Sequence, residues 1–263
     1  MLYRTIALVL VLLMPVRAAA EIVADLYQAK ALVTGTEEPE RSRGFRAALA
    51  DVAVKITGDT ALERDTRLEG LLARAPELVA SYTYEDRMKG IPVHDEQGTR
   101  ERPHILTVTF DTERLDAAIA TLGYRRWSED RPVVAVWLGI GAANGNYVLG
   151  SGGSAGYGQR AVLTESAARR GLPIRLPAEG QSAITYEDVA GRRPAVFRAS
   201  PPEAAAHLLG TLIPGGDGYW TMEWTLRHAG QETLWRLRGV TFDQALKSGI
   251  DTTVGLLRAA PAQ

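Results

Sequence analysis

Four histidines are the side chains best suited to acid–base or metal chemistry in this 263-residue chain: His94, His104, His207 and His228. No two of them are three or four positions apart, the spacing that places two metal ligands on one face of a helix. A metal site or a catalytic triad would need the fold to gather them from distant positions. We expect each histidine to be solvated or held by a single hydrogen bond.

The carboxylates are scattered in the same way. Glu85 and Asp86 are expected on a strand, Asp111 at the start of a helix and Asp188 near a turn. Each has a capping or solvation role available, and no pair can be placed at the separation that glycoside hydrolysis requires. The chain has no cysteine, so it has no thiolate nucleophile and no cysteine zinc site. The sequence therefore predicts no catalytic, cofactor-binding or metal-binding residues.

A glycine-rich stretch at 139–158 is the one segment that invites a phosphate-binding interpretation. Gly139 and Gly141 follow an apolar strand, but Asn144 stands where the third glycine of a dinucleotide-binding turn belongs. The serines in the stretch have the wrong offsets for the G-x-S-x-G turn of a serine hydrolase. We interpret the stretch as a flexible surface loop that packs against nothing.

The tryptophans Trp220 and Trp224 could form an aromatic platform for a sugar or a peptide. They alternate with polar residues over 220–226, the pattern of a half-buried strand, so we expect them in the core. On the return strand, Arg236 and Arg238 are expected to point outward into solvent.

The N-terminus has the pattern of a cleavable export signal. Arg4 precedes an apolar run over 6–16, and the small residues Ala18 and Ala20 fit a signal-peptidase site. The run is shorter than the roughly 20 apolar residues that a membrane-spanning helix needs. We expect cleavage after Ala20 and release into the periplasm.

The overall charge narrows the class of partner. The net charge is −1, and no block of like charge stands out. This argues against binding to nucleic acid, which needs a concentrated basic surface on the protein, and against electrostatic docking on anionic lipid. Because 46% of the residues are hydrophobic, a sizeable core can form without disulfides.

Periodicity predicts a strand–helix–helix–strand–strand–helix order in the first half, with a long mobile loop over 90–103. The expected elements are a strand at 27–33, helices from about 40 to 56 and 67 to 79, strands at 81–85 and 105–110, and a helix at 111–122. Gly58 and Gly123 are placed to end helices. The charged segment 124–132 is predicted to be a linker.

The second half is predicted to alternate strands and helices. The expected elements are a strand at 133–138, a helix at 160–170 ended by Gly171, a strand at 172–176, a helix from Ser200 through Leu212, strands around Trp224 and Trp235, and a helix opened by Thr241. Ser200 with Glu203, and Thr241 with Gln244, each have capping-box spacing.

These elements indicate an α+β protein with two small α/β sandwich-type domains, each a mixed or antiparallel sheet covered by helices. The predicted boundaries are a signal peptide at 1–20, an N-terminal domain at 21–123, the linker at 124–132 and a C-terminal domain at 133–260.

Short motifs spread along the chain resemble a secreted Gram-negative family catalogued only as a domain of unknown function (DUF 2066). The motifs are Tyr27-Gln28-Ala29, Lys55-Ile56-Thr57-Gly58-Asp59, Ser81-Tyr82-Thr83-Tyr84, Phe110-Asp111, Trp127 with Arg131-Pro132, and Arg170-Gly171-Leu172-Pro173 with Leu176-Pro177. The segment 178–181 departs from the acidic stretch that the resemblance leads us to expect there. The resemblance implies location and boundaries and supplies no activity.

The second half is also loosely similar to the N-terminal domain of the translocation protein of the Tol system. The shared feature is the order of elements, and fold alone does not determine function.

We therefore expect an exported periplasmic accessory protein that binds an envelope protein and carries no cofactor, acting in envelope assembly or maintenance. The alternative is a secreted hydrolase whose site is assembled from distant residues. A deep pocket that gathers at least two of the candidate side chains would favour the hydrolase. The candidates are His94, His104, His207, Asp86, Asp111 and Asp188. A shallow surface with exposed apolar residues would favour partner binding.

Overall fold

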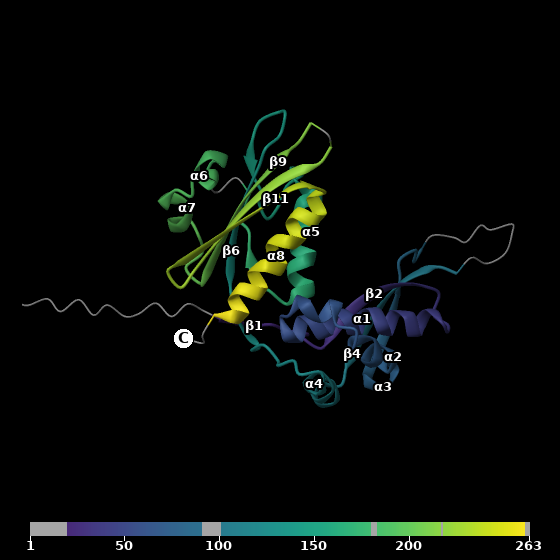
Figure 1. The fold of residues 1–263 in the computed structure, drawn as a ribbon. Helices are drawn as coiled ribbons and strands as arrows, with labels where there is room; N and C mark the ends of the chain where they lie inside the picture. The colour runs from purple at the N-terminus through teal and green to yellow at the C-terminus, as the bar shows by residue number, and fades with distance from the viewer. Residues whose placement is uncertain (1–19, 91–100, 180–182, 217, 261–263) are drawn as a thin grey trace, which may run out of the picture.

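The computed structural model describes residues 20–90, 101–179, 183–216 and 218–260. The described chain forms two units, each built around its own hydrophobic core (Figure 1). The first unit spans residues 28–121 and the second spans residues 134–259. The fold class is α+β, as predicted. The expected export signal lies outside the described residues, except for Ala20.

The first unit is a three-stranded antiparallel sheet covered by helices on one face. Its strand order is β2-β4-β3, so β2 and β3 are the edge strands. The strands are β2 (Gln28–Thr34), β3 (Val79–Asp86) and β4 (Pro103–Phe110). The helices are α1 (Glu40–Thr57), the 3-10 helix η1 (Thr60–Arg64), α2 (Leu68–Ala73), α3 (Ala75–Leu78) and α4 (Thr112–Thr121).

Helix α1 forms where its apolar residues recur every three or four positions, and these residues pack on the sheet. Phe45, Leu49 and Val52 join Val33 and Leu106 in the first core. The opposite face of the sheet is not covered in this way, and Lys30 and Leu32 are exposed there. The alternation of buried and exposed residues along β2 is the pattern of a strand with one buried face.

Two predicted features of the first unit are confirmed and one is different. Gly58 ends α1 in the left-handed conformation with φ 64°, and Asp111 caps α4 by accepting a hydrogen bond from the Arg114 N–H. The helix predicted over 67–79 is two short helices, α2 and α3, separated at Arg74. Pro76 in the first turn of α3 fits a helix start better than a helix interior. The loop predicted over 90–103 lies largely outside the described residues.

The second unit is a mixed sheet of six strands with helices on both faces. The order is β11-β10-β9-β6-β7, and β8 also pairs with β6. The strands are β6 (Val134–Ile140), β7 (Tyr147–Val148), β8 (Ile174–Arg175), β9 (Ala206–Pro214), β10 (Trp220–His228) and β11 (Gln231–Val240). The helices are α5 (Tyr157–Arg170), α6 (Tyr186–Ala190), α7 (Pro194–Arg198) and α8 (Phe242–Ala259).

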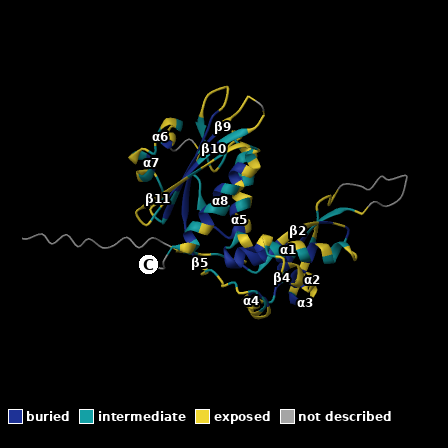
Figure 2. Cartoon of the chain, in the orientation of Figure 1, coloured by how far each residue is buried: buried dark blue, intermediate teal, exposed yellow. Residues whose placement is uncertain are grey.

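Helices α5 and α8 lie together on one face of this sheet, and α6 and α7 lie on the other (Figure 1). Strand β6 is therefore covered on both sides, and each of its residues is buried (Figure 2). This agrees with the unbroken apolar run that predicted a doubly covered strand. Among the described residues, no helix is long and apolar enough to cross a membrane.

The helix predicted from Ser200 through Leu212 is wrong. That segment contains β9, a central strand between β6 and β10, so His207 lies on a strand and not on a helix. An apolar run such as Leu208, Leu209 and Leu212 fits a doubly covered strand as well as a helix face. Ser200 follows α7, and its hydroxyl accepts a hydrogen bond from the Trp137 indole at 2.9 Å.

The glycine-rich stretch 139–158 is also more ordered than predicted. It contains β7, and Leu149 is fully buried. Arg160 at the start of α5 reaches back and donates to the carbonyls of Gly150, Gly152 and Gly153. The stretch is therefore a folded turn held by one guanidinium group.

The segment predicted as a linker carries a strand of its own. Strand β5 (Asp130–Pro132) pairs antiparallel with β1 (Ala20–Ile22), which ties the start of the described chain to the junction between the units.

Trp224 is the centre of the second core, as the strand pattern predicted, and two glycines make room for it. The indole is fully buried, and a Cβ added at Gly210 or Gly249 would overlap its ring atoms. In a core packed to this density, neither position has room for a side chain.

We expect Gly249→Ala to lower the free energy of unfolding by about 2 kcal/mol, because the added methyl group overpacks the Trp224 indole. Gly255 lies in the same helix, and a methyl group added there would meet no heavy atom within 4 Å outside the backbone of that helix. Gly255→Ala is the matched control and should stabilise the protein by about 0.5–1 kcal/mol through helix propensity. Urea unfolding followed by circular dichroism compares the two variants. Equal effects would contradict the packing argument.

Candidate functional site: a groove along an open strand edge

The structure brings two of the predicted candidate residues together. Asp86 and His104 stand opposite each other on β3 and β4. Both are already engaged. The Asp86 carboxylate accepts from the Met88 N–H at 2.7 Å and from Arg102 at 2.9 Å, which lowers its pKa, and His104 Nδ1 lies 2.8 Å from the Arg102 carbonyl. His94 lies outside the described residues.

The other candidate carboxylates cap the N-terminal ends of helices. Asp111 caps α4, and Asp188 completes a capping box with Thr185 at the start of α6. The backbone N–H of Thr185 is the largest cause of the lowered pKa of Asp188. Arg193 adds an ion pair at 3.0 Å. These contacts are the capping roles that the sequence predicted.

The remaining histidines lie in the second unit, away from Asp86 and His104. His207 on β9 stacks edge-on against Phe197 at 5.3 Å, and burial lowers its pKa. His228 ends β10, and its Nδ1 lies 3.1 Å from the Ala205 carbonyl. Within the described residues, no cluster of three or more histidines and carboxylates is placed to hold a metal ion.

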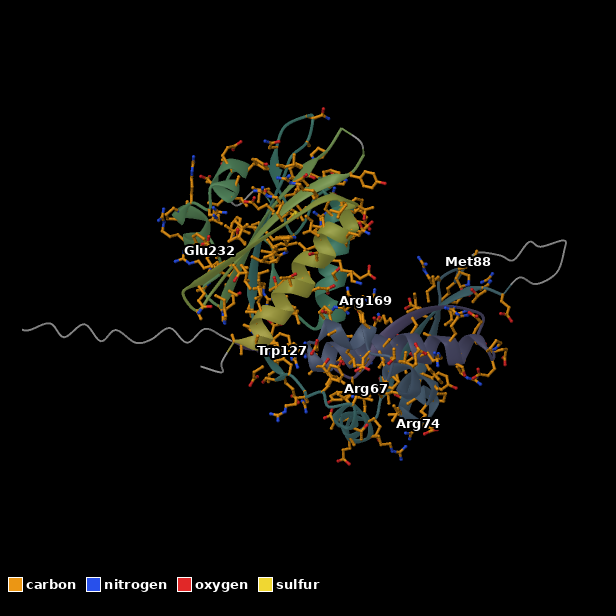
Figure 3. The ribbon with its side chains drawn as sticks, viewed as in Figure 1. Arg67, Arg74, Met88, Trp127, Arg169 and Glu232 are labelled. Atoms are coloured by element: carbon orange, nitrogen blue, oxygen red, sulfur yellow. The ribbon has the colours of Figure 1, made fainter. Side chains whose placement is uncertain are left out.

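A groove of about 800 Å³ runs where the first unit meets α5 of the second. Strand β2, helix α1 and helix α5 supply most of its lining, with Glu85 and Ile105 from the neighbouring strands. The lining residues are Asp25, Gln28, Ala29, Lys30, Ala31, Leu32, Ala47, Asp51, Lys55, Glu85, Ile105, Glu165, Ala168 and Arg169. Arg169 lies at the end of α5 that faces the first unit (Figure 3). Four acids and three bases give the groove a nearly balanced charge.

The groove follows the free edge of β2. Hydrogen bonds from the Phe110 N–H to the Tyr27 carbonyl and from the Gly35 N–H to the Arg102 carbonyl show that odd-numbered residues of β2 face β4. Because successive residues alternate in direction, the backbone groups of the even-numbered residues point away from β4, into the groove.

At both ends of this edge, side chains form hydrogen bonds with the backbone groups that point away from β4. At one end, the Lys55 amine donates to the Gln28 carbonyl at 2.6 Å. At the other end, Arg43 donates to the Leu32 carbonyl, and Glu40 accepts from the Thr34 N–H, both at 3.2 Å.

The centre of the edge stays open. No residue of the described chain bonds to the Lys30 N–H, the Lys30 carbonyl or the Leu32 N–H. Beside them, Leu32 is 52% exposed. The edge therefore offers two donors and one acceptor next to an exposed apolar side chain.

Lys55 is the buried charge of the groove. It is 9% exposed, and burial lowers the pKa of its amine while the nearby Asp51 opposes that shift. Asp51 also forms an ion pair with Arg169 of α5. The two units thus share a charged wall beside the open edge.

Arg131 fixes the junction that shapes the groove. Its side chain is fully buried between the units. The two terminal nitrogens donate to the carbonyls of Lys55 at 2.6 Å, Arg170 at 2.7 Å and Gly171 at 2.9 Å, and Nε donates to the Ser128 carbonyl at 3.2 Å. The carbonyls of Lys55, Arg170 and Gly171 lie at the C-terminal ends of α1 and α5, which carry partial negative charge and lack helical partners. One guanidinium therefore caps two converging helices. Burial lowers the pKa of Arg131 to about 10.

Further contacts hold the same junction. Arg170 of α5 is buried and pairs with Glu63 of the first unit and Asp251 of α8, both at 2.7 Å. Arg258 of α8 pairs with Asp59 at 2.8 Å. Trp127 lies between the two units (Figure 3). The guanidinium carbon of Arg131 lies over the Trp127 ring, 4.3 Å from the ring centroid. These contacts join the two units on either side of the groove.

A second hollow of about 620 Å³ lies between α2, α3 and α4 and is rimmed by Arg67, Arg74 and Arg114. Each of these arginines already faces an acid of its own segment, at 2.6, 2.9 and 3.9 Å respectively. We therefore place the candidate site at the β2 groove.

Sequence reasoning named Glu85 among the scattered carboxylates but did not predict the groove. Lys55 and Arg131 appeared only as parts of family-like motifs, and Arg131 stood in a segment predicted to be a linker. Whether a strand lies at the edge of a sheet depends on its pairing with distant strands, which one strand's sequence does not contain.

A family model matches the chain over residues 20–128, and its description is Domain of unknown function (DUF8605). The match covers β1 through Trp127, so it includes β2, α1 and Lys55 but not Arg131 or α5. No curated protein matches the chain. The first unit is thus similar to a family of unknown function, as the motifs led us to expect, although that family is numbered differently from the one they suggested.

Proposed function

We propose that this protein is a non-catalytic accessory protein of the cell envelope that binds an extended segment of another protein along β2. The observation that carries the proposal is the open centre of the β2 edge, set in a groove and closed at both ends. An extended peptide opposite Lys30 would exchange two hydrogen bonds with that residue and accept a third from Leu32. This is strand addition, in which the main chain supplies affinity.

The residues that line the groove indicate what kind of peptide segment can bind there. Leu32 and Ile105 offer apolar contact on one side of the added strand, and α5 stands as a wall on the other. The nearly balanced charge favours a segment without a strong charge of its own. With both ends of the edge closed, pairing is limited to a few residues, which suits a short linear motif.

The engaged state of Asp86 and His104 supports a binding role over the alternative of a secreted hydrolase. A general base must have a free lone pair within reach of the proton that it abstracts. The Asp86 carboxylate already accepts from Met88 and Arg102, and these contacts lower its pKa and make it a weaker base. Neither Asp86 nor His104 lines the β2 groove.

The test uses a displayed library of random ten-residue peptides, selected against the purified protein. We expect selected peptides to bind Lys30→Pro at least about tenfold more weakly than wild type, because proline removes the open N–H and its ring blocks pairing. Lys30→Ala keeps the backbone and removes the charge, so binding should stay within about threefold of wild type. Fluorescence anisotropy with labelled peptides measures the three affinities.

The Lys30 N–H points away from β4, so proline there removes no hydrogen bond of the folded chain. Circular dichroism should therefore show a native spectrum for both variants. Selection of no peptides, or of peptides that bind Lys30→Pro as well as wild type, would refute strand addition at β2.

The proposed location has a separate test. Cell fractionation should recover the protein in the periplasm with Glu21 as its first residue. Intact protein in the cytosol that keeps its first twenty residues would refute the location without affecting the binding test.

A further inference from the structure

The longest free edge in the described chain belongs to β11, at the far side of the second unit. Glu232 marks this edge, well away from Arg169 and the β2 groove (Figure 3). The opposite edge of the same sheet is occupied by β7 and β8, each only two residues long. Short edge strands are a common protection against unwanted pairing, and β11, with ten residues, lacks it.

The turn before β11 shows which of its backbone groups are free. Ala229 and Gly230 form a two-residue turn with φ 49° and 76°, the conformation of a type I′ hairpin. In such a hairpin the closing residues, His228 and Gln231, exchange hydrogen bonds, so odd-numbered residues of β11 face β10.

Four even-numbered residues of β11 therefore direct their N–H and carbonyl groups outward: Glu232, Leu234, Arg236 and Arg238. No hydrogen bond from any other described residue reaches these backbone groups. Leu234 is 50% exposed beside them. The edge is thus a regular row of unpaired donors and acceptors, the template that an additional strand requires.

We propose that this edge pairs with β11 of a second copy of the chain, antiparallel, about a two-fold axis through Trp235. In this register Glu232 of each copy lies directly opposite Arg238 of the other, and Leu234 lies opposite Arg236. Opposite charges in directly facing positions stabilise antiparallel pairs. The pairing is isologous, so it closes as a dimer and exposes no further edge of this kind.

Charge selects this register over its neighbours. A shift that centres the axis on Arg236 places two arginines opposite each other, which is destabilising. A shift that centres it on Leu234 places Glu232 opposite Arg236, which already pairs with Glu223, and leaves Arg238 opposite Gly230 in the turn without a charged partner. Arg238 has no ion-pair partner among the described residues, whereas Arg236 already pairs with Glu223. The register through Trp235 gives each Arg238 a carboxylate.

The existing contacts of the edge are compatible with the dimer. Glu232 lies 3.6 Å from Arg192 and remains 47% exposed, so its carboxylate can accept a second cation. The outward side chains share the sheet face that carries α6 and α7. On that face α6 packs over β6 and β9, and Val196 of α7 packs in the same cluster as Leu209 of β9.

The experiment measures the mass of the purified protein by sedimentation equilibrium from about 1 to 100 μM, the range in which a modest interface associates. We expect the wild type to show twice the mass of the chain at the upper concentrations. Leu234→Pro should show the mass of one chain, because proline blocks the edge and removes no hydrogen bond to β10. Lys30→Pro, a matched proline at the β2 edge, should remain dimeric.

Charge exchange tests the register independently of proline. Glu232→Arg or Arg238→Glu alone should weaken the dimer about tenfold, because each creates two like-charge pairs per dimer. The double variant Glu232→Arg/Arg238→Glu should recover the wild-type dissociation constant within about threefold. If Leu234→Pro fails to fold, these variants still decide the question.

A wild type that stays monomeric at about 100 μM, or a dimer that neither Leu234→Pro nor the single charge variants weaken, would overturn the proposal. The variants expected to weaken the dimer lie on β11 and those of the peptide-binding test lie on β2, and the two tests measure different quantities, so either proposal can fail without the other.

Discussion

Replacing Arg131 with methionine is expected to lower the free energy of unfolding by about 4 kcal/mol. Methionine fills much of the same volume but leaves the carbonyls of Lys55, Arg170 and Gly171 buried without a donor. It also removes the positive charge from the C-terminal ends of α1 and α5, where it is favourable.

Arg125 provides the control for this prediction. It lies six positions earlier in the same charged segment and is exposed. Arg125→Met should change stability by no more than about 0.5 kcal/mol. Urea unfolding is followed by tryptophan fluorescence, which reports mainly on the second unit, and by circular dichroism, which reports on both. If the two methionine variants are equally stable, Arg131 does not hold the junction.

Trp224→Ala is expected to cost about 4 kcal/mol, through the cavity it leaves in the second core. The indole is fully buried, stacks against Trp235 at 6.5 Å and donates to the Ala245 carbonyl at 3.0 Å. Because Gly210 and Gly249 both contact the ring, no larger side chain stands at either position to fill the space.

Two variants separate the causes of that loss. Trp224→Phe keeps an aromatic ring and removes the donor to Ala245, so the expected loss is smaller, about 2 kcal/mol. Tyr157→Ala removes a ring that is 72% exposed and should change stability by about 0.5 kcal/mol or less. Urea midpoints from circular dichroism rank the variants. A Trp224→Ala variant as stable as Tyr157→Ala would contradict the assignment of Trp224 to the core.

Sequence reasoning was most successful where local chemistry decides the structure. Gly58 at the end of α1 and the box of Thr241 and Gln244 at the start of α8 lie where predicted. Caps and turns depend on residues close in the chain, so one stretch of sequence contains the information they need. The alternation around Trp224 likewise predicted both the strand and its buried face.

The secondary-structure prediction was wrong where a helix and a buried strand share the same pattern of apolar residues. The leucines after Ser200 are consistent with a helix face and with a central strand, and only the partners β6 and β10 decide between them. Proline and glutamate after Ser200 added a helix-start signal. In the structure these residues form a turn that leads into β9.

The candidate site could not be predicted from the sequence for a different reason. Arg131 stands in a charged segment, where an arginine is normally solvated, and its burial depends on the approach of α5 from 39 residues away. The free edge of β2 results from pairing that places β4 between β2 and β3. Both features come from long-range contacts that residue types alone do not reveal.

The position of α5 in the chain affects when the β2 groove can exist. Strand β2 and helix α1 are complete by residue 57, whereas the α5 wall and the contacts of Asp251 and Arg258 come roughly a hundred residues later or more. A chain that emerges N-terminus first would present the β2 edge before its wall is in place. Binding of a partner in the walled groove therefore requires the fully folded protein. Before α5 has folded, the exposed β2 edge would be a target for chaperones that hold unfolded chains.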